Sequence, residues 1–449
     1  MGTLYQESPN TGILDLKVTL QDSSLVFPTK ETERKSMFLS NIDQVLNFPV
    51  QTVHFFPSHR SYPFKTVVEK LKSALCKLLV PYDFLAGRLK LNPQLGRLEF
   101  DCNAAGASFA VASSEFPLDQ IGDLVYPNPA FRQLVQSFDK LGPEDQPLCA
   151  VQVTSFKCGG FAMGISTNHV AFDGISFKIF LQNLASQAFD DKPLAVLPCN
   201  DRGLLAARSP PSVTFPHHEL LKLKLPIGEE SGPPVFDCPP EDLNFRIFRL
   251  SSDHIASLKE KAKAGNTKAR ITGFNVVTTH IWRCKALSCD TGNNLDRIST
   301  ILYAVDIRSR LQPPLPASYA GNAVLSTYAM AQCKELEEGP FSRLVEMVSE
   351  GNARMTAEYA RSAIDWGELY KGFPHGEFLI SSWWRLGFTE VEYPWGKPRY
   401  SCPLVYHRKD IILLFPDIDG LSSNGVNVLV ALPAKEMEKF QALFHKLLA

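Results

Sequence analysis

The sequence predicts an α/β (α+β) protein built from two large domains that a long crossover loop joins. The first observation is the alternation of strand-like and helical apolar patterns in both halves of the chain. The second is length, because 449 residues exceed one ordinary core when domains average about 150 residues. The third is a proline-rich stretch over residues 193–240, which holds ten of the 32 prolines and has the composition of a surface linker.

The N-terminal half carries strands and helices that can be located by periodicity and by turn residues. The run VQTVHFFP predicts a strand at 50–57 that its proline closes. Helical apolar spacing predicts a helix over 64–80, and residues 81–112 predict a strand region with a hairpin. Alternating apolar residues from Phe161 predict a further strand, and helical spacing resumes at Gly174.

The C-terminal half restarts with a strand after the proline-rich stretch. Its patterns predict strands at 245–250, 411–415 and 426–432, helices at 254–264, 271–288 and 434–448, and a strand that runs into a proline-rich loop over 300–324. We therefore expect an N-terminal domain at 1–200, a crossover linker at 201–243 and a C-terminal domain at 244–449.

Composition and charge narrow the class of protein. The 46 basic and 47 acidic residues leave a net charge of −1, so no overall field favours nucleic acid or an anionic membrane. The ten cysteines form no CxxC pair and no zinc spacing, which indicates no metal site and a reducing compartment. No signal-peptide layout and no run of about 18 apolar residues is present. We expect a cytoplasmic protein without membrane insertion, nucleic acid, metal or bound cofactor.

The sequence His169-Val170-Ala171-Phe172-Asp173-Gly174 follows a predicted strand and precedes a predicted helix. A histidine on such a loop suits a general base, because an imidazole with a pKa near 6.5 is largely neutral around pH 7. The alternative is a histidine with a structural role only. Asp173 could orient the imidazole or could cap the helix by accepting the N–H of Ser176, and we favour the structural role. Gly174 suits a sharp entry into the helix.

The chain resembles the plant BAHD acyltransferases, whose mark is HxxxDG on such a loop, and the resemblance covers nearly the whole sequence. Ala86 to Leu89 matches an Ala-Gly-Arg-Leu segment, and residues 306–310 with a following Gly-Asn match an Asp-x-Arg-x-Arg segment. The resemblance implies two chloramphenicol-acetyltransferase-like domains, each a mixed β-sheet with flanking helices. It also implies that His169 deprotonates a hydroxyl or amine that attacks an acyl-coenzyme A thioester.

The resemblance implies structural roles for a further set of residues. Arg308 matches the arginine that ties down the HxxxD aspartate, and the alternative is an exposed surface charge. The family's Asp-Phe-Gly-Trp-Gly stands here as Glu392-Tyr393-Pro394-Trp395-Gly396, where Glu392, Trp395 and Gly396 keep a structural role. Glu392 could pair with Arg283. Pro394 cannot adopt the positive φ that glycine allows, which puts the path of this loop in question.

A segment upstream of that motif carries the remaining candidate site residues. Ser381-Ser382-Trp383 matches a Thr-Ser-Trp stretch that borders the acyl carbonyl in hydroxycinnamoyltransferases of the family. Ser381 or Trp383 could therefore donate to the developing oxyanion, and the alternative for Trp383 is a core aromatic. Arg385 matches a position that grips the acceptor carboxylate in shikimate-using members, although other members carry a basic residue there too.

The function implied by the resemblance is acyl transfer from coenzyme A to a small-molecule alcohol or amine in plant specialised or cuticle metabolism. The sequence has no G-x-S-x-G elbow, so direct transfer without an acyl-enzyme is expected. The aromatic surroundings of Trp383 favour hydroxycinnamoyl or other aromatic donors, and O-acylation is favoured over N-acylation. We expect a monomer whose co-substrate is acyl-coenzyme A. The alternative is a noncatalytic BAHD-like partner in wax-precursor elongation.

Overall fold

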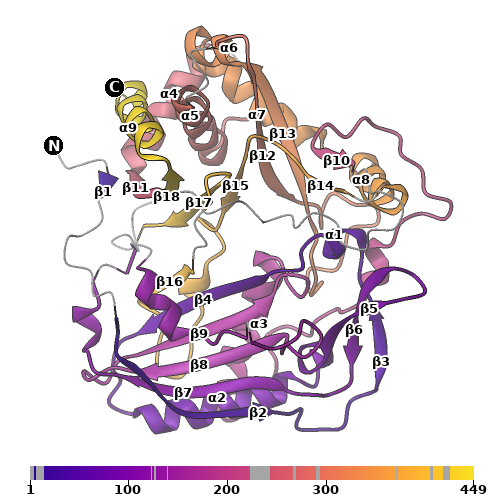
Figure 1. Ribbon diagram of the computed structural model, residues 1–449, viewed down its shortest axis with the longest axis vertical. Coiled ribbons are helices and arrows are strands. Elements are labelled where there is room, and N and C mark those ends of the chain that lie inside the picture. The colour runs from indigo at the N-terminus through magenta and orange to yellow at the C-terminus, as the bar shows by residue number, and fades with distance from the viewer. Residues whose placement is uncertain are drawn as a thin grey trace.

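The chain folds into two lobes, each built around one large sheet (Figure 1). The computed structural model describes residues 5–6, 15–122, 124–125, 128–138, 140–222, 243–265, 269–289, 294–370, 372–404, 408–417 and 425–448. One sheet has six strands in the order β16-β4-β9-β8-β7-β2, and the other has seven in the order β1-β11-β18-β17-β15-β12-β13. Both mix parallel and antiparallel neighbours, so the predicted fold class is confirmed.

The elements of the first half follow the predicted order. The strands are β1 (Tyr5–Gln6), β2 (Val18–Val26), β3 (Lys35–Phe38), β4 (Pro49–Phe56), β5 (Arg88–Asn92), β6 (Arg97–Cys102), β7 (Ala107–Ser114), β8 (Cys149–Ser155), β9 (Phe161–Asn168) and β10 (Leu220–Lys222). The α-helices are α1 (Asn41–Gln44), α2 (Phe64–Leu78) and α3 (Gly174–Ala188). The 3₁₀ helices are η1 (Asp83–Ala86), η2 (Leu118–Gln120), η3 (Pro129–Leu134) and, at the start of the expected crossover, η4 (Arg202–Leu205). The predicted strand 50–57 and helix 64–80 are confirmed as β4 and α2.

The second half contains more helices than the sequence patterns revealed. Its strands are β11 (Asn244–Leu250), β12 (Ile298–Asp306), β13 (Val324–Gln332), β14 (Gly372–Pro374), β15 (Phe378–Ser382), β16 (Tyr400–Pro403), β17 (Ile411–Pro416) and β18 (Val426–Leu432). Its helices are α4 (Ser252–Lys263), α5 (Gly273–Ser288), α6 (Cys333–Glu338), α7 (Phe341–Arg354), α8 (Ala357–Leu369) and α9 (Ala434–Leu448), with a 3₁₀ turn η5 (Phe388–Glu390).

Helices α2 and α3 pack together against one face of the six-stranded sheet. The buried face of α2, which includes Leu71 and Leu75, joins Met163 and Ile165 of β9 in one apolar cluster. These side chains recur with helical period along α2 and with period 2 along β9, so each element presents a continuous apolar face. The strand β9 is thereby fixed along its length, and its last residue, Asn168, lies directly before His169.

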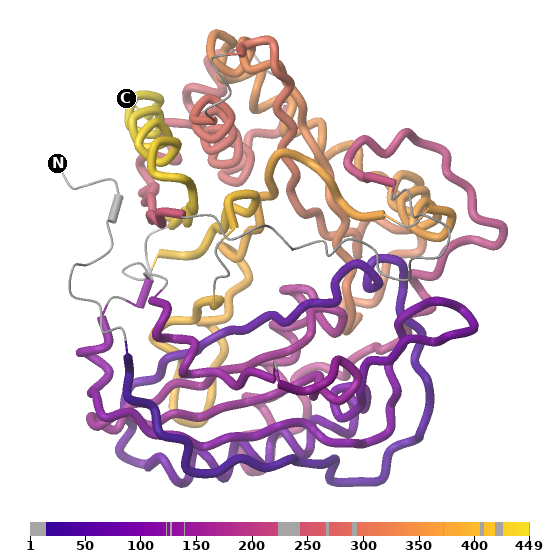
Figure 2. The backbone as a smooth tube through the Cα atoms, in the orientation of Figure 1, coloured from indigo at the N-terminus to yellow at the C-terminus, as the bar shows by residue number. Residues whose placement is uncertain are grey.

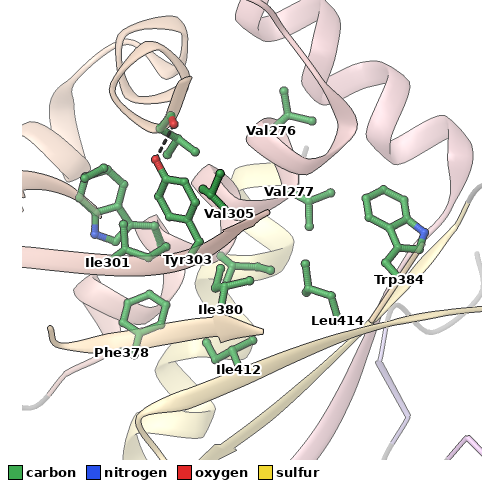
Figure 3. Packing of buried hydrophobic residues seen from close by; sticks show 14 of the residues in the cluster. Val276, Val277, Ile301, Tyr303, Val305, Phe378, Ile380, Trp384, Ile412 and Leu414 are labelled. Atoms are coloured by element: carbon green, nitrogen blue, oxygen red, sulfur yellow. Dashed lines mark hydrogen bonds between the residues drawn. The ribbon is translucent and has the colours of Figure 1, made fainter. Parts of the chain in front are cut away.

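The core of the other lobe forms where α5 lies over the seven-stranded sheet (Figure 3). Val277 of α5 lies over Leu414 of β17, and both belong with Val276 and Ile380 of β15 to one apolar cluster. Tyr303 of β12 is buried and donates its hydroxyl to the carbonyl of Val348 at 2.5 Å, which satisfies the one polar group that this ring brings into the core. The helix predicted over 271–288 is confirmed as α5.

Each large sheet takes an edge strand from the other half of the chain. Strand β16 pairs antiparallel with β4 at the edge of the six-stranded sheet, and it lies among the purple strands of Figures 1 and 2. Strand β1 pairs with β11 at the edge of the other sheet. The division into domains at 1–200 and 244–449 with a linker at 201–243 stays a prediction. Strands β1 and β16 differ from it, because each pairs with the sheet of the other half. Within the expected crossover, residues 223–242 lie outside the described residues.

Candidate active site

His169 is the first residue after β9, and its backbone and ring are held by the loop that precedes β4. Its N–H donates to the carbonyl of Phe48 at 2.8 Å, and the two rings lie 5.0 Å apart. The side chain is partly exposed. Its Nδ1 is enclosed and has no hydrogen-bond partner among the described residues. Burial lowers the pKa of the imidazole below its usual 6.5, because a charged ring would lose hydration there. The neutral form, which can accept a proton, is therefore favoured at pH 7.

Asp173 caps α3 and pairs with Arg308, and both of its oxygens are occupied by these contacts. Oδ1 accepts from the N–H of Ser176 at 2.9 Å, and Oδ2 accepts from the N–H of Ala323 at 2.9 Å. Nη2 of Arg308 lies 2.9 Å from the carboxylate. No hydrogen bond between Asp173 and the imidazole of His169 is formed, so Asp173 does not orient the ring in the manner of a catalytic triad.

Arg308 is a buried residue that joins the two lobes, with only 6% of its surface exposed. Besides Asp173, its guanidinium donates to the hydroxyl of Ser176 at 2.8 Å and to the carbonyl of Gly321 at 2.9 Å. It also pairs with Asp306 at 2.9 Å. A planar guanidinium with several donors suits such a convergence of acceptors. The alternative that Arg308 is an exposed surface charge is therefore wrong.

Gly174 allows a segment of the C-terminal half to approach the start of α3. A Cβ built on Gly174 would lie 2.5 Å from Cδ1 of Leu386, so a larger residue would push this side chain away. Leu386 packs with Trp383 against the apolar cluster of the six-stranded sheet. The segment 383–388 thus lies against the helix that begins beside the HxxxDG loop.

Two residues to which no sequence pattern assigned a role, Asn322 and Arg202, hold the carbonyl groups of this loop. The side-chain amide of Asn322 donates to the carbonyl of His169 at 2.9 Å. The guanidinium of Arg202 donates to the carbonyls of Val170 at 3.1 Å and Ala171 at 2.9 Å. Asn322 belongs to the Gly-Asn pair that accompanies the family's arginine motif, so a role could have been assigned to it. Arg202 lies in the proline-rich stretch, and no local pattern marks it.

The candidate oxyanion donors and the candidate acceptor residue lie around the end of β15. The ring of Trp383 lies 5.5 Å from Phe388, which in turn lies 5.4 Å from Phe177 of α3. Ser381 is partly buried within β15. Arg385 is exposed and its guanidinium lies 5.0 Å from the ring of Trp384, a residue of the C-terminal core. Trp383 therefore lies on the side of α3, whereas Arg385 lies on the side of the C-terminal core.

The Glu392–Gly396 segment forms a tight turn far along β9 from His169. The backbone groups of Tyr393 and Gly396 bond to each other in both directions at 2.9 and 3.2 Å, and Gly396 has φ +99°. Trp395 packs 5.9 Å from Phe161, at the start of a strand of eight residues that spans about 26 Å. This placement indicates a structural role for the turn, because His169 follows the opposite end of the strand.

The pairing of Glu392 with Arg283 is wrong. Arg283 donates to the backbone carbonyls of Leu336 and Glu337 at 2.8 and 2.9 Å, near the end of α6. Glu392 instead lies 3.7 Å from Lys397, and both side chains are more than half exposed. Pro394 occupies the second position of the turn, where its fixed φ is compatible, and the positive φ falls on the retained glycine.

Within the described ranges, the chain shows neither a metal-binding cluster nor a membrane-spanning helix. No group of three or more His, Cys, Asp or Glu side chains is arranged to hold a metal ion within the described ranges. Among the helices that the structure describes, none combines the length and the apolar composition needed to cross a bilayer.

Comparisons with known proteins show which family and which solved structures the chain is similar to. A model described as the Transferase family matches residues 16–447. The chain is 63% identical to an Acyltransferase GLAUCE of Arabidopsis thaliana, over 99% of each chain. It is 33% identical to a fatty alcohol:caffeoyl-CoA acyltransferase of the same species, over 96% of this chain and 98% of that one. The fold resembles that of vinorine synthase, with a TM-score of 0.73, 24% identity and coverage of 94% and 96%.

Proposed function

Because the chain belongs to the BAHD acyltransferase family, we propose that it transfers an aromatic acyl group from coenzyme A to a hydroxyl group. The acyltransferase class follows from the family. The aromatic donor and the alcohol acceptor are supported by the name of the relative that uses caffeoyl-CoA and a fatty alcohol. The proposed acceptor is a small-molecule alcohol of specialised or cuticle metabolism, and an amine acceptor is an outcome of the test below.

The observation that carries the proposal is the neutral, partly exposed imidazole of His169 on a loop held from both lobes. The enclosed Nδ1 leaves Nε2 as the nitrogen that meets substrate. Nε2 accepts the hydroxyl proton while the acceptor oxygen attacks the carbonyl carbon of the thioester. The carbon–sulfur bond then breaks, and the imidazolium returns its proton to the departing thiolate.

The developing oxyanion needs a hydrogen-bond donor near the thioester carbonyl. Ser381 and Trp383 are the candidates, because Ser381 lies near the end of β15 and Trp383 directly follows this strand and packs on the side of α3. A preorganised donor of this kind stabilises the transition state by about 3 to 4 kcal/mol in other acyl transfers. Arg385 points to the other lobe, so a role in binding an acceptor carboxylate has less support.

The alternative function, a noncatalytic partner in wax-precursor elongation, was motivated by the replacement of Asp-Phe-Gly-Trp-Gly. The turn at Tyr393–Gly396 closes with its positive φ on Gly396, and the exposed Glu392 pairs locally. These contacts form an ordinary closed turn, so they do not support the idea that the replacement impairs the loop. The alternative is therefore retained only as an outcome of the experiment.

The test incubates purified protein with a panel of hydroxycinnamoyl and aliphatic acyl-coenzyme A thioesters and with alcohol and amine acceptors, and it follows free thiol release. We expect release with an aromatic donor and an alcohol. His169→Ala should lower the rate by roughly 10²-fold or more, whereas replacement of the exposed His59 by alanine should not. A folded protein that releases no thiol with any pair would favour the noncatalytic partner.

A further inference from the structure

Arg202 is a fully buried arginine at the start of the crossover, and its guanidinium faces the HxxxDG loop. Only 1% of its surface is exposed. It donates to the carbonyls of Val170 and Ala171, and to that of Ala320 at 3.1 Å. Its counter-ion is Asp43 at 3.0 Å, and both side chains of this pair are 0% exposed. One cation from the crossover therefore binds the loop, the C-terminal half and α1 together.

The carboxylate of Asp43 is held by Ser40 as well as by Arg202. Its Oδ2 accepts from the backbone N–H and the hydroxyl of Ser40, each at 2.8 Å, in the capping box that begins α1. Its Oδ1 accepts from Arg202 and, at 2.8 Å, from the amide of Asn322. The carboxylate thus orients the two side chains that bind the loop.

Asn322 completes the set of contacts to the loop from the other lobe. Its amide nitrogen lies 2.9 Å from the carbonyl of His169 and 3.2 Å from that of Val170. The carbonyls of three consecutive residues, 169 to 171, therefore accept hydrogen bonds from Asn322 and Arg202. These bonds add to the one from the N–H of His169 to the carbonyl of Phe48. Asp173 does not contribute, since it bonds elsewhere, and Nδ1 of His169 has no partner among the described residues.

We propose that Arg202, Asn322 and Asp43 form a positioning cluster for His169, an inference that rests on the acyl transfer proposed above. The cluster fixes the backbone at residues 169–171, and the backbone fixes where the imidazole points. Catalysis by a general base depends on this placement, because an error of about 1 Å can lower a rate on the order of 10²-fold. Arg202 and Asp43 act through His169 and do not touch substrate.

The decisive variants are Arg202→Met, Asp43→Asn and the double variant. Each single change leaves one buried charge without its partner, so both single variants should be less stable. The double variant carries no unpaired charge and should recover much of the melting temperature. The carbonyl of Ala171 stays without its donor, however, and that of Val170 keeps only Asn322. We therefore expect kcat to remain at least ten-fold below the wild type while KM for the thioester changes less than about two-fold. If the double variant recovers kcat as well as stability, Arg202 and Asp43 form only a structural ion pair and do not position His169.

Arg208→Met is the matched control. Arg208 lies six residues further along the same segment and pairs with the buried Asp365 of α8 at 2.6 Å, but no hydrogen bond joins it to the loop in the described structure. We expect a lower melting temperature and an unchanged kcat per folded molecule. A matching loss of kcat in Arg208→Met would show that any weakening of the crossover lowers the rate, which would overturn the assignment to Arg202.

Asn322→Ala keeps the experiment decisive if the Arg202 variants do not fold. It removes the donor to the carbonyl of His169 without changing any charge, and kcat should fall at least ten-fold with little change in KM. A normal kcat in this variant would contradict the positioning cluster. A wild-type protein that releases no thiol would instead overturn the proposed function, so the two failures are distinguishable.

Discussion

The carboxylate of Asp173 and the guanidinium of Arg308 lie 2.9 Å apart, although 135 residues separate them in the sequence. Asp173 caps α3 in the N-terminal half, and Arg308 follows β12 in the C-terminal half. Their side chains are only 4% and 7% exposed. The pair ties the two lobes together four residues from His169 without touching its imidazole.

Removal of either partner of this pair should destabilise the fold. We expect Asp173→Ala and Arg308→Ala each to lower the free energy of unfolding by about 3 to 5 kcal/mol, because the remaining charge stays buried without its counter-ion. Urea titration measures this change. Glu392→Ala serves as the control, since its exposed pair with Lys397 should contribute only about 0 to 1 kcal/mol. Unchanged stability in both variants would show that the pair does not hold the lobes together.

The rate should rise with pH and then level off. Burial holds the pKa of His169 below its usual 6.5, and only the neutral imidazole can accept the proton. The fraction in the neutral form therefore increases as pH rises through a value below 6.5, and kcat/KM should follow it. Profiles of kcat/KM from pH 5 to 8 measure the midpoint. A midpoint above 7 would contradict the desolvated base.

Acyl transfer should proceed with donor and acceptor bound together. The proposed mechanism uses His169 as the base, and the sequence has no G-x-S-x-G elbow, so we expect the acceptor itself to attack the thioester. Initial-rate plots over both substrates should intersect. Mass spectrometry of the protein mixed with donor alone should detect no covalent adduct. Parallel lines together with a stable acyl adduct would contradict direct transfer.

The turn at Tyr393–Gly396 should affect stability more than rate. Gly396→Ala should cost about 1 to 2 kcal/mol, because φ +99° is unfavourable for a residue with a Cβ. Pro394→Gly should cost about 0.4 to 1 kcal/mol through the greater freedom of the unfolded chain. Glu392→Asp should be nearly neutral. We expect kcat within about two-fold in all three variants, and a large gain in rate on Pro394→Gly would instead indicate an impaired native loop.

Stability should fall as the pH is lowered from about 6.5. Burial lowers the pKa of His280 to about 3, so between these values the unfolded chain binds a proton that the folded one does not. Each such group reduces stability by up to ~1.4 kcal/mol per pH unit. His280→Gln should therefore narrow the difference between unfolding free energies at pH 7 and pH 5. His59→Gln, at an exposed position, should leave that difference unchanged.

The elements that a local pattern encodes could be predicted from the sequence. The helix over 271–288 appears as α5 because its apolar residues repeat with helical period. Asp173 caps α3 through Ser176, as its place one residue before the helix indicates. The helices α6, α7 and α8 were not identified, although apolar residues such as Leu344 and Val348 repeat along α7.

The missing parts of the candidate site depend on tertiary contacts. Arg202 lies among prolines and charged residues, and only the folded chain brings Asp43 to it across 159 positions. The apolar pattern of β16 is no more strand-like than that of the residues around it. Its place in the N-terminal sheet depends on pairing with β4. The Glu392–Arg283 pairing failed because an exposed carboxylate is satisfied by its nearest lysine, whereas Arg283 is held by carbonyls at the end of α6.

Because β16 pairs with β4, the ribosome must synthesise most of the C-terminal half before the N-terminal sheet can be completed. Strand β9, the partner of β4 within the sheet, ends at Asn168, and the strand that covers the open edge of β4 begins at Tyr400. At about 5 to 20 residues per second, the ribosome adds that stretch in roughly 12 to 46 s. Throughout that interval the nascent N-terminal lobe displays an unpaired edge that can recruit strands from neighbouring chains. A chain that terminates before Tyr400 keeps this edge open permanently, although the whole N-terminal half has been made.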